Sequence, residues 1–128
     1  TWVVSVDDVS KLESRLGRSA VDGQRKKPDG SELSWKQIGV LGTLEDRQLP
    51  FFIEWKSIDH PSSDGKPSAK IVKIEIAGDQ KTLQDWLGAD LSDAVGSGIE
   101  IEWVAGEDGE SGIVAVHLDT PNGKIRLD

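Results

Sequence analysis

Two short segments of the chain repeat each other, and this repeat constrains the fold more than any other feature of the sequence. Residues 8–17 and 79–88 share an aspartate, two leucines and a glycine at a constant offset of 71 positions. In each copy the aspartate stands where a helix N-cap is expected, and the leucines fall on one helical face. The glycine follows the last apolar residue, where a left-handed C′ position favours it. The repeat therefore predicts one helix at the same place in each of two related units.

Strand-like segments surround the two expected helices in the same order. One apolar run precedes each helix, at residues 2–6 and 71–76. Three more runs follow each helix, at residues 20–25, 32–38 and 49–55 in the first half and at 99–104, 113–118 and 124–127 in the second. We therefore expect one α+β domain made of two βαβββ modules, residues 1–56 and 69–128, joined by a serine- and proline-rich linker at 57–68.

Composition and charge exclude several classes of function. The chain has 128 residues, which suits a single domain, and no cysteine, which excludes disulfides and thiolate chemistry. With 23 acidic against 15 basic residues the net charge is −8, so a nucleic acid would meet net repulsion. The one basic cluster, residues 25–27, is expected to be a solvated hairpin end. We therefore expect no nucleic-acid partner.

Neither a membrane segment nor a secretion signal is apparent in the sequence. No apolar run approaches the roughly 20 residues that a membrane-spanning helix needs, and the start of the chain lacks the basic and apolar segments of a signal peptide. Together with the lack of cysteine, this predicts a cytoplasmic protein with no membrane partner. The chain contains no methionine, so it does not include a translation start, and we expect that part of the protein upstream of it is missing from this sequence.

Several local motifs accompany this order of elements. They are Lys-Pro-Asp-Gly at 27–30 with Leu-Ser-Trp at 33–35, Leu-Pro-Phe-Phe-Ile-Glu-Trp at 49–55 with His-Pro at 60–61, and Leu-Asp-Thr-Pro-Asn-Gly at 118–123 with residues 125–127. Over essentially the whole chain they resemble the glyoxalase-like domain family of the vicinal-oxygen-chelate superfamily, which includes glyoxalases, bleomycin-resistance proteins and dioxygenases. The resemblance implies two modules whose curved mixed sheets surround a cup for a small ligand, with helices on the outer face. It also implies a further module upstream, which this sequence does not contain and which could supply part of the site.

Enzymes of that superfamily place metal ligands, usually histidine and glutamate, on the first and last strands of paired modules. Strand alternation predicts that Ser5, Glu54, Glu75 and Arg126 occupy the corresponding inward positions. This set contains no imidazole, and a guanidinium cannot ligate a metal and would repel a cation. We therefore expect no metal site within this chain, and a divalent metal cofactor would need ligands from outside it. Glu75 with Arg126 is expected to form an ion pair, and both are candidate ligand-binding residues.

Glu54 is the first catalytic candidate. It lies between Ile53 and Trp55 on an otherwise apolar strand, so desolvation is expected to raise its pKa toward the range of a general base. The alternative is that Glu54 pairs with Arg25 or a backbone donor and only stabilises the strand. His60, in the serine- and proline-rich loop, is the second catalytic candidate, with a surface role as its alternative.

Aromatic residues supply the other candidate ligand contacts. Trp35 and Trp103 are each expected on a sheet, where either could wall an apolar ligand, with core packing as the alternative. Arg25 is a further ligand-binding candidate. His117 is expected to be a solvent-facing or hydrogen-bonded structural residue.

Three functions are consistent with these features. The first is a glyoxalase-like protein that acts on or binds a small organic metabolite in the cup, with lyase- or dioxygenase-like chemistry if it is an enzyme. The second is a non-catalytic binding module, like resistance proteins of this architecture. The third is a structural or dimerising module whose cup is closed by its own side chains, forming a homodimer. A fold alone does not decide among them.

Overall fold

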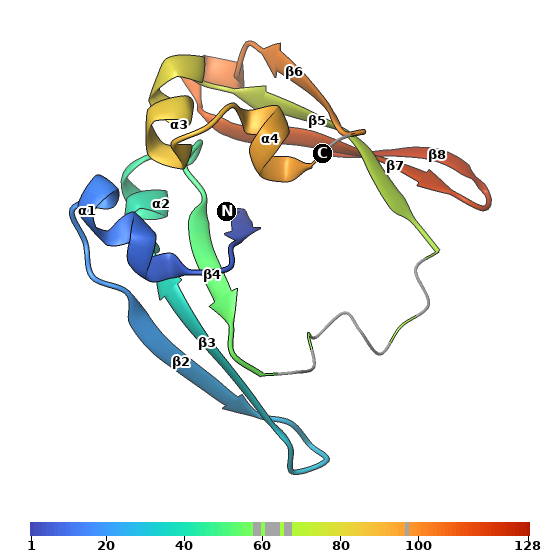
Figure 1. Cartoon of the computed structure of the whole chain (residues 1–128). Coiled ribbons are helices and arrows are strands. Elements are labelled where there is room, and N and C mark those ends of the chain that lie inside the picture. The colour runs from blue at the N-terminus through green and yellow to red at the C-terminus, as the bar shows by residue number, and fades with distance from the viewer. Residues whose placement is uncertain (58–59, 61–64, 66–67, 97) are drawn as a thin grey trace.

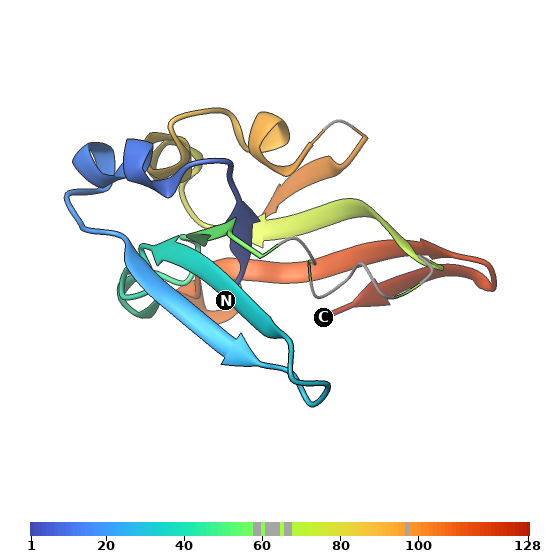
Figure 2. The same ribbon diagram turned by 60° about the horizontal axis from the view of Figure 1, so that its bottom comes forward.

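The computed structural model describes residues 1–57, 60, 65, 68–96 and 98–128 as an α+β fold of two four-stranded mixed sheets (Figure 1). Most of the expected linker at 57–68 lies outside the described residues. The helices η1, α1, α3 and α4 lie together on one side of the two sheets, as Figure 2 shows. This side is called the helix side below, and the other the open side.

Sheet one is built by the first module. Its strands are β1 (Val3–Ser5), β2 (Val21–Lys26), β3 (Glu32–Ile38) and β4 (Phe51–Trp55), in the order β1-β4-β3-β2. β1 runs parallel to β4 and the other pairs are antiparallel. The 3₁₀-helix η1 (Val9–Leu12) and α1 (Glu13–Leu16) connect β1 to β2, and the short α2 (Gly42–Glu45) lies between β3 and β4.

Sheet two is built by the second module, with a different strand order. Its strands are β5 (Lys70–Ala77), β6 (Glu100–Val104), β7 (Gly112–Thr120) and β8 (Gly123–Leu127), in the order β6-β5-β7-β8. The helices α3 (Gln80–Leu87) and α4 (Leu91–Val95) connect β5 to β6, which pair in parallel, and η2 (Glu107–Gly109) precedes β7. The opening strand is thus an edge strand in sheet one and an inner strand in sheet two. The modules share the predicted order of elements but not their strand pairing.

The repeated helix signals form as the sequence predicts. Asp8 accepts a hydrogen bond from the backbone of Ser10, and Asp79 accepts one from the backbone of Thr82. Gly17 and Gly88 end the helices with φ of 63° and 71°, in the left-handed region that favours glycine. The first copy differs from the prediction in one respect, because it begins as a 3₁₀ turn and holds only one α-helical turn. None of the helices in the described ranges is long and apolar enough to cross a membrane.

One hydrophobic core joins the two modules on the helix side. Phe52 of sheet one lies against Trp86 of α3, with ring centroids 6.5 Å apart. The fully buried Val9, Ile76 and Leu83 bring η1, β5 and α3 into the same cluster. The two modules therefore share one hydrophobic core, which neither sheet completes alone.

A buried amide at the junction adds polar contacts between the modules. Gln48 is 5% exposed, its Oε1 accepts from the backbone N–H of Asp79 at 2.8 Å, and its Nε2 donates to Asp46 at 2.7 Å. Ser111 Oγ donates to the same Asp46 carboxylate at 3.0 Å. Burial raises the pKa of Asp46, but the hydrogen bonds from Gln48 and Ser111 outweigh burial and hold it below its usual value.

Candidate functional site

A pocket of about 980 Å³ lies between the first module and the open side of sheet two. Its volume is at the upper end of the usual range for small-molecule sites. The first module contributes Thr1, together with Thr43, Leu44 and Arg47 from α2 and the residues after it. The second contributes the last residue of β6, the connection that follows it with Glu107 and Glu110, and the start of β7. Glu75, Arg126 and Asp128 complete the wall.

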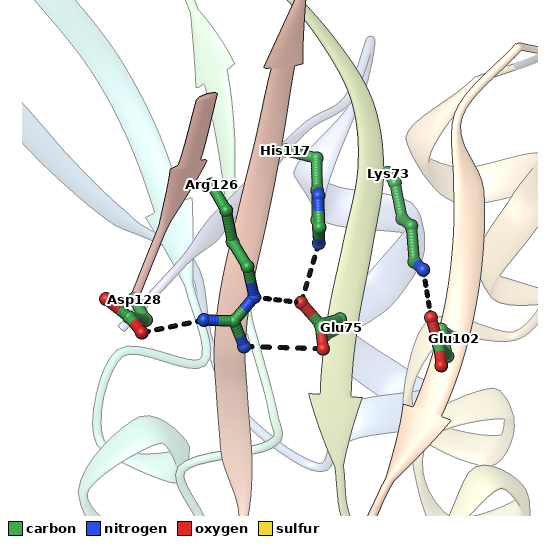
Figure 3. Close-up of polar contacts among 6 residues, drawn as sticks. All are labelled: Lys73, Glu75, Glu102, His117, Arg126 and Asp128. Atoms are coloured by element: carbon green, nitrogen blue, oxygen red, sulfur yellow. Dashed lines mark hydrogen bonds and ion pairs between the residues drawn. The ribbon is translucent and has the colours of Figure 1, made fainter. Parts of the chain in front are cut away.

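Three charged or titratable side chains from neighbouring strands meet on the open side of sheet two (Figure 3). Glu75 projects from β5, His117 from β7 and Arg126 from β8. Arg126 Nε donates to Glu75 Oε2 at 2.8 Å and its Nη2 donates to Oε1 at 3.4 Å, while His117 Nε2 lies 2.6 Å from the same Oε2. Arg126 Nη1 also donates to Asp128 Oδ2 at 2.6 Å. The predicted ion pair of Glu75 with Arg126 is therefore present.

Strand alternation explains why these residues share one face. Ile74 and Ile76 flank Glu75 on β5 and are buried on the helix side, so Glu75 projects to the open side. Lys73 also projects to this side, where it forms an ion pair with Glu102 of β6 (Figure 3). The open side of sheet two is thus a charged surface next to the pocket.

Glu75 is held as a carboxylate by its neighbours. The hydrogen bond from Arg126 is the main cause, and the one from His117 adds to it, so that the pKa of Glu75 falls to about 2. The same contact with Glu75 raises the pKa of Arg126 above its usual value. A carboxylate with so low a pKa is a poor proton acceptor near neutral pH, so Glu75 is suited to orienting Arg126 and His117 rather than to general-base catalysis.

The low pKa of Glu75 predicts a stability contribution that depends on pH. Since the folded-state pKa of about 2 lies below the ordinary 4.5, the contribution is complete above about pH 4.5 and is lost as the pH falls toward 2. Glu75→Gln should therefore lower the free energy of unfolding clearly at neutral pH and much less at about pH 2. Urea denaturation across this range measures the difference. Glu32→Gln, at an exposed residue of β3, controls for the loss of one negative charge. An equal loss at both pH values in Glu75→Gln would contradict the prediction.

The described residues do not fit the divalent metal that the superfamily's enzymes use. No three histidine or acidic side chains among them lie close enough together to hold a metal ion. Both oxygens of Glu75 already accept from a guanidinium, which would repel a cation placed there. The expectation from sequence that these residues supply no metal site stays a prediction.

Glu54 lies on the other side of its sheet from the one predicted. β1 pairs with β4 so that Val4 is opposite Phe52, and both belong to the helix-side core, which places Glu54 on the helix side as well. There its Oε2 accepts from the backbone N–H of Val9 at 3.1 Å, and its Oε1 accepts from Lys56. These two hydrogen bonds, that from Lys56 first, hold the pKa of Glu54 below its usual value, so the predicted rise is wrong.

The position of Glu54 matches the alternative of a backbone donor, because its carboxylate binds the first N–H of η1. Arg25 does not reach it, since β3 separates β2 from β4. A catalytic role for Glu54 stays a prediction, and the pocket between the modules does not include this residue.

The aromatic candidates divide between the two sides of the fold. Trp35 pairs in register with Trp55 on the open side of sheet one, with ring centroids 5.6 Å apart, and His60 meets Trp55 edge-on at 5.0 Å. Arg25 is exposed on β2, two residues beyond Gly23, which the Trp35 ring covers. Trp103 instead pairs with Ile76 and packs against the helix-side core. This is the core packing that the sequence analysis gave as the alternative to a ligand contact. The two tryptophans therefore do not wall one cup.

Sequence reasoning missed part of this site. It predicted a solvent-facing or hydrogen-bonded structural role for His117 but did not name its partner, although His117 lies in register with Arg126 on β8 and bonds Glu75. It did not consider Asp128, although residues two apart on a strand share a face and Arg126 precedes it at that spacing. It also missed α2 and therefore the first module's wall of the pocket, because a four-residue helix leaves no periodic signal.

Comparison with known proteins identifies the family. No match was found among curated proteins or among solved structures. The family model of the glyoxalase-like domain matches residues 1–91, which hold the first module together with β5, α3 and the first residue of α4. The motif at 118–127 lies beyond the matched residues. Since the match covers most of the 128 residues and accompanies an α+β fold of two mixed sheets, the chain belongs to the glyoxalase-like domain family.

Proposed function

We propose that this domain binds a small polar organic molecule in the pocket between its two modules. The observation that carries the proposal is that a pocket of ligand size has the linked side chains of Glu75, Arg126 and Asp128 in its wall. Binding sites are mostly preformed cavities with a few well-oriented polar groups, and Glu75 orients Arg126 in this way. Membership of the glyoxalase-like family supports the architecture but not a substrate.

The charges of the wall favour a polar ligand over an apolar one. Arg47 and Arg126 supply two guanidinium groups, and Glu75, Glu107, Glu110 and Asp128 supply carboxylates. Arg47 pairs with Glu110 at 3.7 Å across exposed side chains, so this pair can open to a ligand at little cost. We propose binding without catalysis by these residues, since the pKa of Glu75 is too low for it to act as a base.

Filling the pocket tests this proposal. A panel of small polar compounds is screened by two-dimensional ¹H–¹⁵N NMR, and hits are expected to shift the backbone signals of Ile113 and Val114, which line the pocket. Val114→Phe should abolish these shifts by occupying the space. Ile125→Phe, in the same sheet on an exposed residue that does not line the pocket, should leave them unchanged. Hits that bind both variants alike would place binding elsewhere and refute the proposal.

The sequence-based expectations of a homodimer, of a cytoplasmic location and of no nucleic-acid or membrane partner stay predictions. The exposed aliphatic side chains of Ile71, Ile125 and Leu127 in sheet two are the surface through which copies of the chain are expected to associate. Sedimentation velocity over a wide concentration range, with Ile125→Lys as the variant, measures whether copies of the chain associate through it.

A further inference from the structure

The guanidinium of Arg126 is shared unequally between two carboxylates. Glu75 binds it from the sheet through both carboxylate oxygens, and the Glu75 side chain is only 14% exposed. Asp128 binds the opposite nitrogen, Nη1, through one oxygen, and its side chain is 71% exposed. Figure 3 shows the guanidinium between the two acids, with Asp128 on the side away from β5. Glu75 is therefore a fixed partner of Arg126, and Asp128 is a replaceable one.

The part of Arg126 that Asp128 binds belongs to the pocket. Arg126 and Asp128 both line it, and the Arg126 side chain is 43% exposed. A guanidinium has five N–H groups, and the described contacts use one on each nitrogen, so both terminal nitrogens keep a donor. A carboxylate entering the pocket could take the place of Asp128 without disturbing the contact between Arg126 and Glu75.

We propose that Arg126 is the carboxylate-binding group of this pocket and that the side chain of Asp128 occupies the ligand's place in the unbound domain. This inference rests on the proposed function, because it names the chemical class of the ligand that the pocket binds. The ligand is a small organic acid whose carboxylate contacts Arg126 Nη1, with its remaining atoms in the space between Arg47 and the ends of β6 and β7.

The other charges of the wall favour a monoanion over a polyanion. Glu107 and Glu110 line the same pocket, and the Arg47 charge is already offset by Glu110. Glu75 likewise offsets most of the charge of Arg126. A phosphate or dicarboxylate would bring a second negative charge toward these glutamates, whereas a monocarboxylate brings only the charge that Asp128 already places there.

Asp128 competes with the ligand as a tethered carboxylate. A group held on the same chain acts at an effective concentration of the order of millimolar, so weak acids meet a competitor that is always present. Removing the charge of Asp128 should therefore strengthen binding of a carboxylate. The expected gain in affinity is about two- to fivefold, the range that one exposed ion pair is worth.

The test compares acetate and propionate with their neutral analogues acetamide and propionamide at constant ionic strength. Two-dimensional NMR follows the Nε–H signal of Arg126 and the backbone signals of Ile113 and Val114. The acids should shift these signals in the wild type. They should bind Asp128→Asn more tightly than the wild type, and they should not shift the backbone signals in Arg126→Gln. Arg126→Lys keeps the charge but loses the planar fork, and should bind the acids more weakly than the wild type. Glu107→Gln removes one charge from the same wall and is the matched control for Asp128→Asn.

The outcomes separate this inference from the proposed function. Equal shifts by acids and amides, insensitive to Arg126→Gln, would leave pocket binding standing and overturn the carboxylate assignment. An equal gain of affinity in Glu107→Gln and Asp128→Asn would overturn the role of Asp128 as the competing group. If no probe shifts the pocket signals, while the wider panel of polar compounds does, only the carboxylate inference fails. If no compound of either set shifts them, both fail. The dispersion of each variant's spectrum reports whether it is folded.

Discussion

Phe52→Ala should lower the free energy of unfolding by about 3–5 kcal/mol, because it removes a fully buried ring from the core. That loss is a large part of the 5–15 kcal/mol that typically stabilises a domain, so we expect the variant to be partly or wholly unfolded at room temperature. The ring lies on Trp86 of the second module, so its removal leaves a cavity where the two modules meet.

Chemical denaturation followed by tryptophan fluorescence measures this effect. Phe51→Ala is the matched control, since Phe51 is the neighbouring residue of β4, projects to the open side and is only half-buried. We expect a smaller loss of stability in that variant. A loss in Phe52→Ala no larger than in Phe51→Ala would mean that the core does not join the modules at this point.

Gln48→Ala should have the second largest effect, a loss of about 1–3 kcal/mol from polar groups left without their partner. The backbone N–H of Asp79 would lose its acceptor, and the Asp46 carboxylate would lose one of its donors while remaining half-buried. Because that donor helps to hold the pKa of Asp46 below its usual value, the pKa should rise in the variant.

Two measurements check the prediction for Gln48. Urea denaturation gives the change in stability, and an NMR titration of Asp46 gives its pKa. Gln24→Ala, at an exposed position of β2, removes the same side chain where no described partner depends on it, and should change the stability little. Unchanged stability in Gln48→Ala would show that water replaces the amide at the junction.

The local structure could be predicted from the sequence because each signal acts over a few residues. Asp79 and Gly88 mark the beginning and end of α3 by capping and by left-handed geometry, independently of the rest of the chain. The segment 32–38 alternates between the two sides of the sheet and forms β3 with the predicted bounds. The resemblance to glyoxalase-like domains rested on such local motifs, and the family match to residues 1–91 confirms it.

The side on which Glu54 lies could not be predicted in the same way. In the segment Phe-Phe-Ile-Glu-Trp, one alternating set of positions is wholly apolar (Phe51, Ile53 and Trp55) and the other contains Glu54, so periodicity favours packing the first set under the helices, which is the wrong side. The choice is made by tertiary contacts: η1 presents the N–H of Val9, and only the helix side lets Glu54 accept from it. The same limit applies to sheet two, where the parallel pairing of β5 with β6 depends on partners far apart in the sequence.

The position of β8 at the outer edge of sheet two has a consequence for association between chains. An edge strand offers unpaired backbone N–H and C=O groups to any other extended chain, and all five residues of β8 are exposed. Proteins often protect such edges with charged side chains, and Lys124, Arg126 and Asp128 supply charge at every second position. Neutral replacement of Arg126 removes one of these charges, so we expect such variants to aggregate more readily on concentration, whatever their affinity for a ligand.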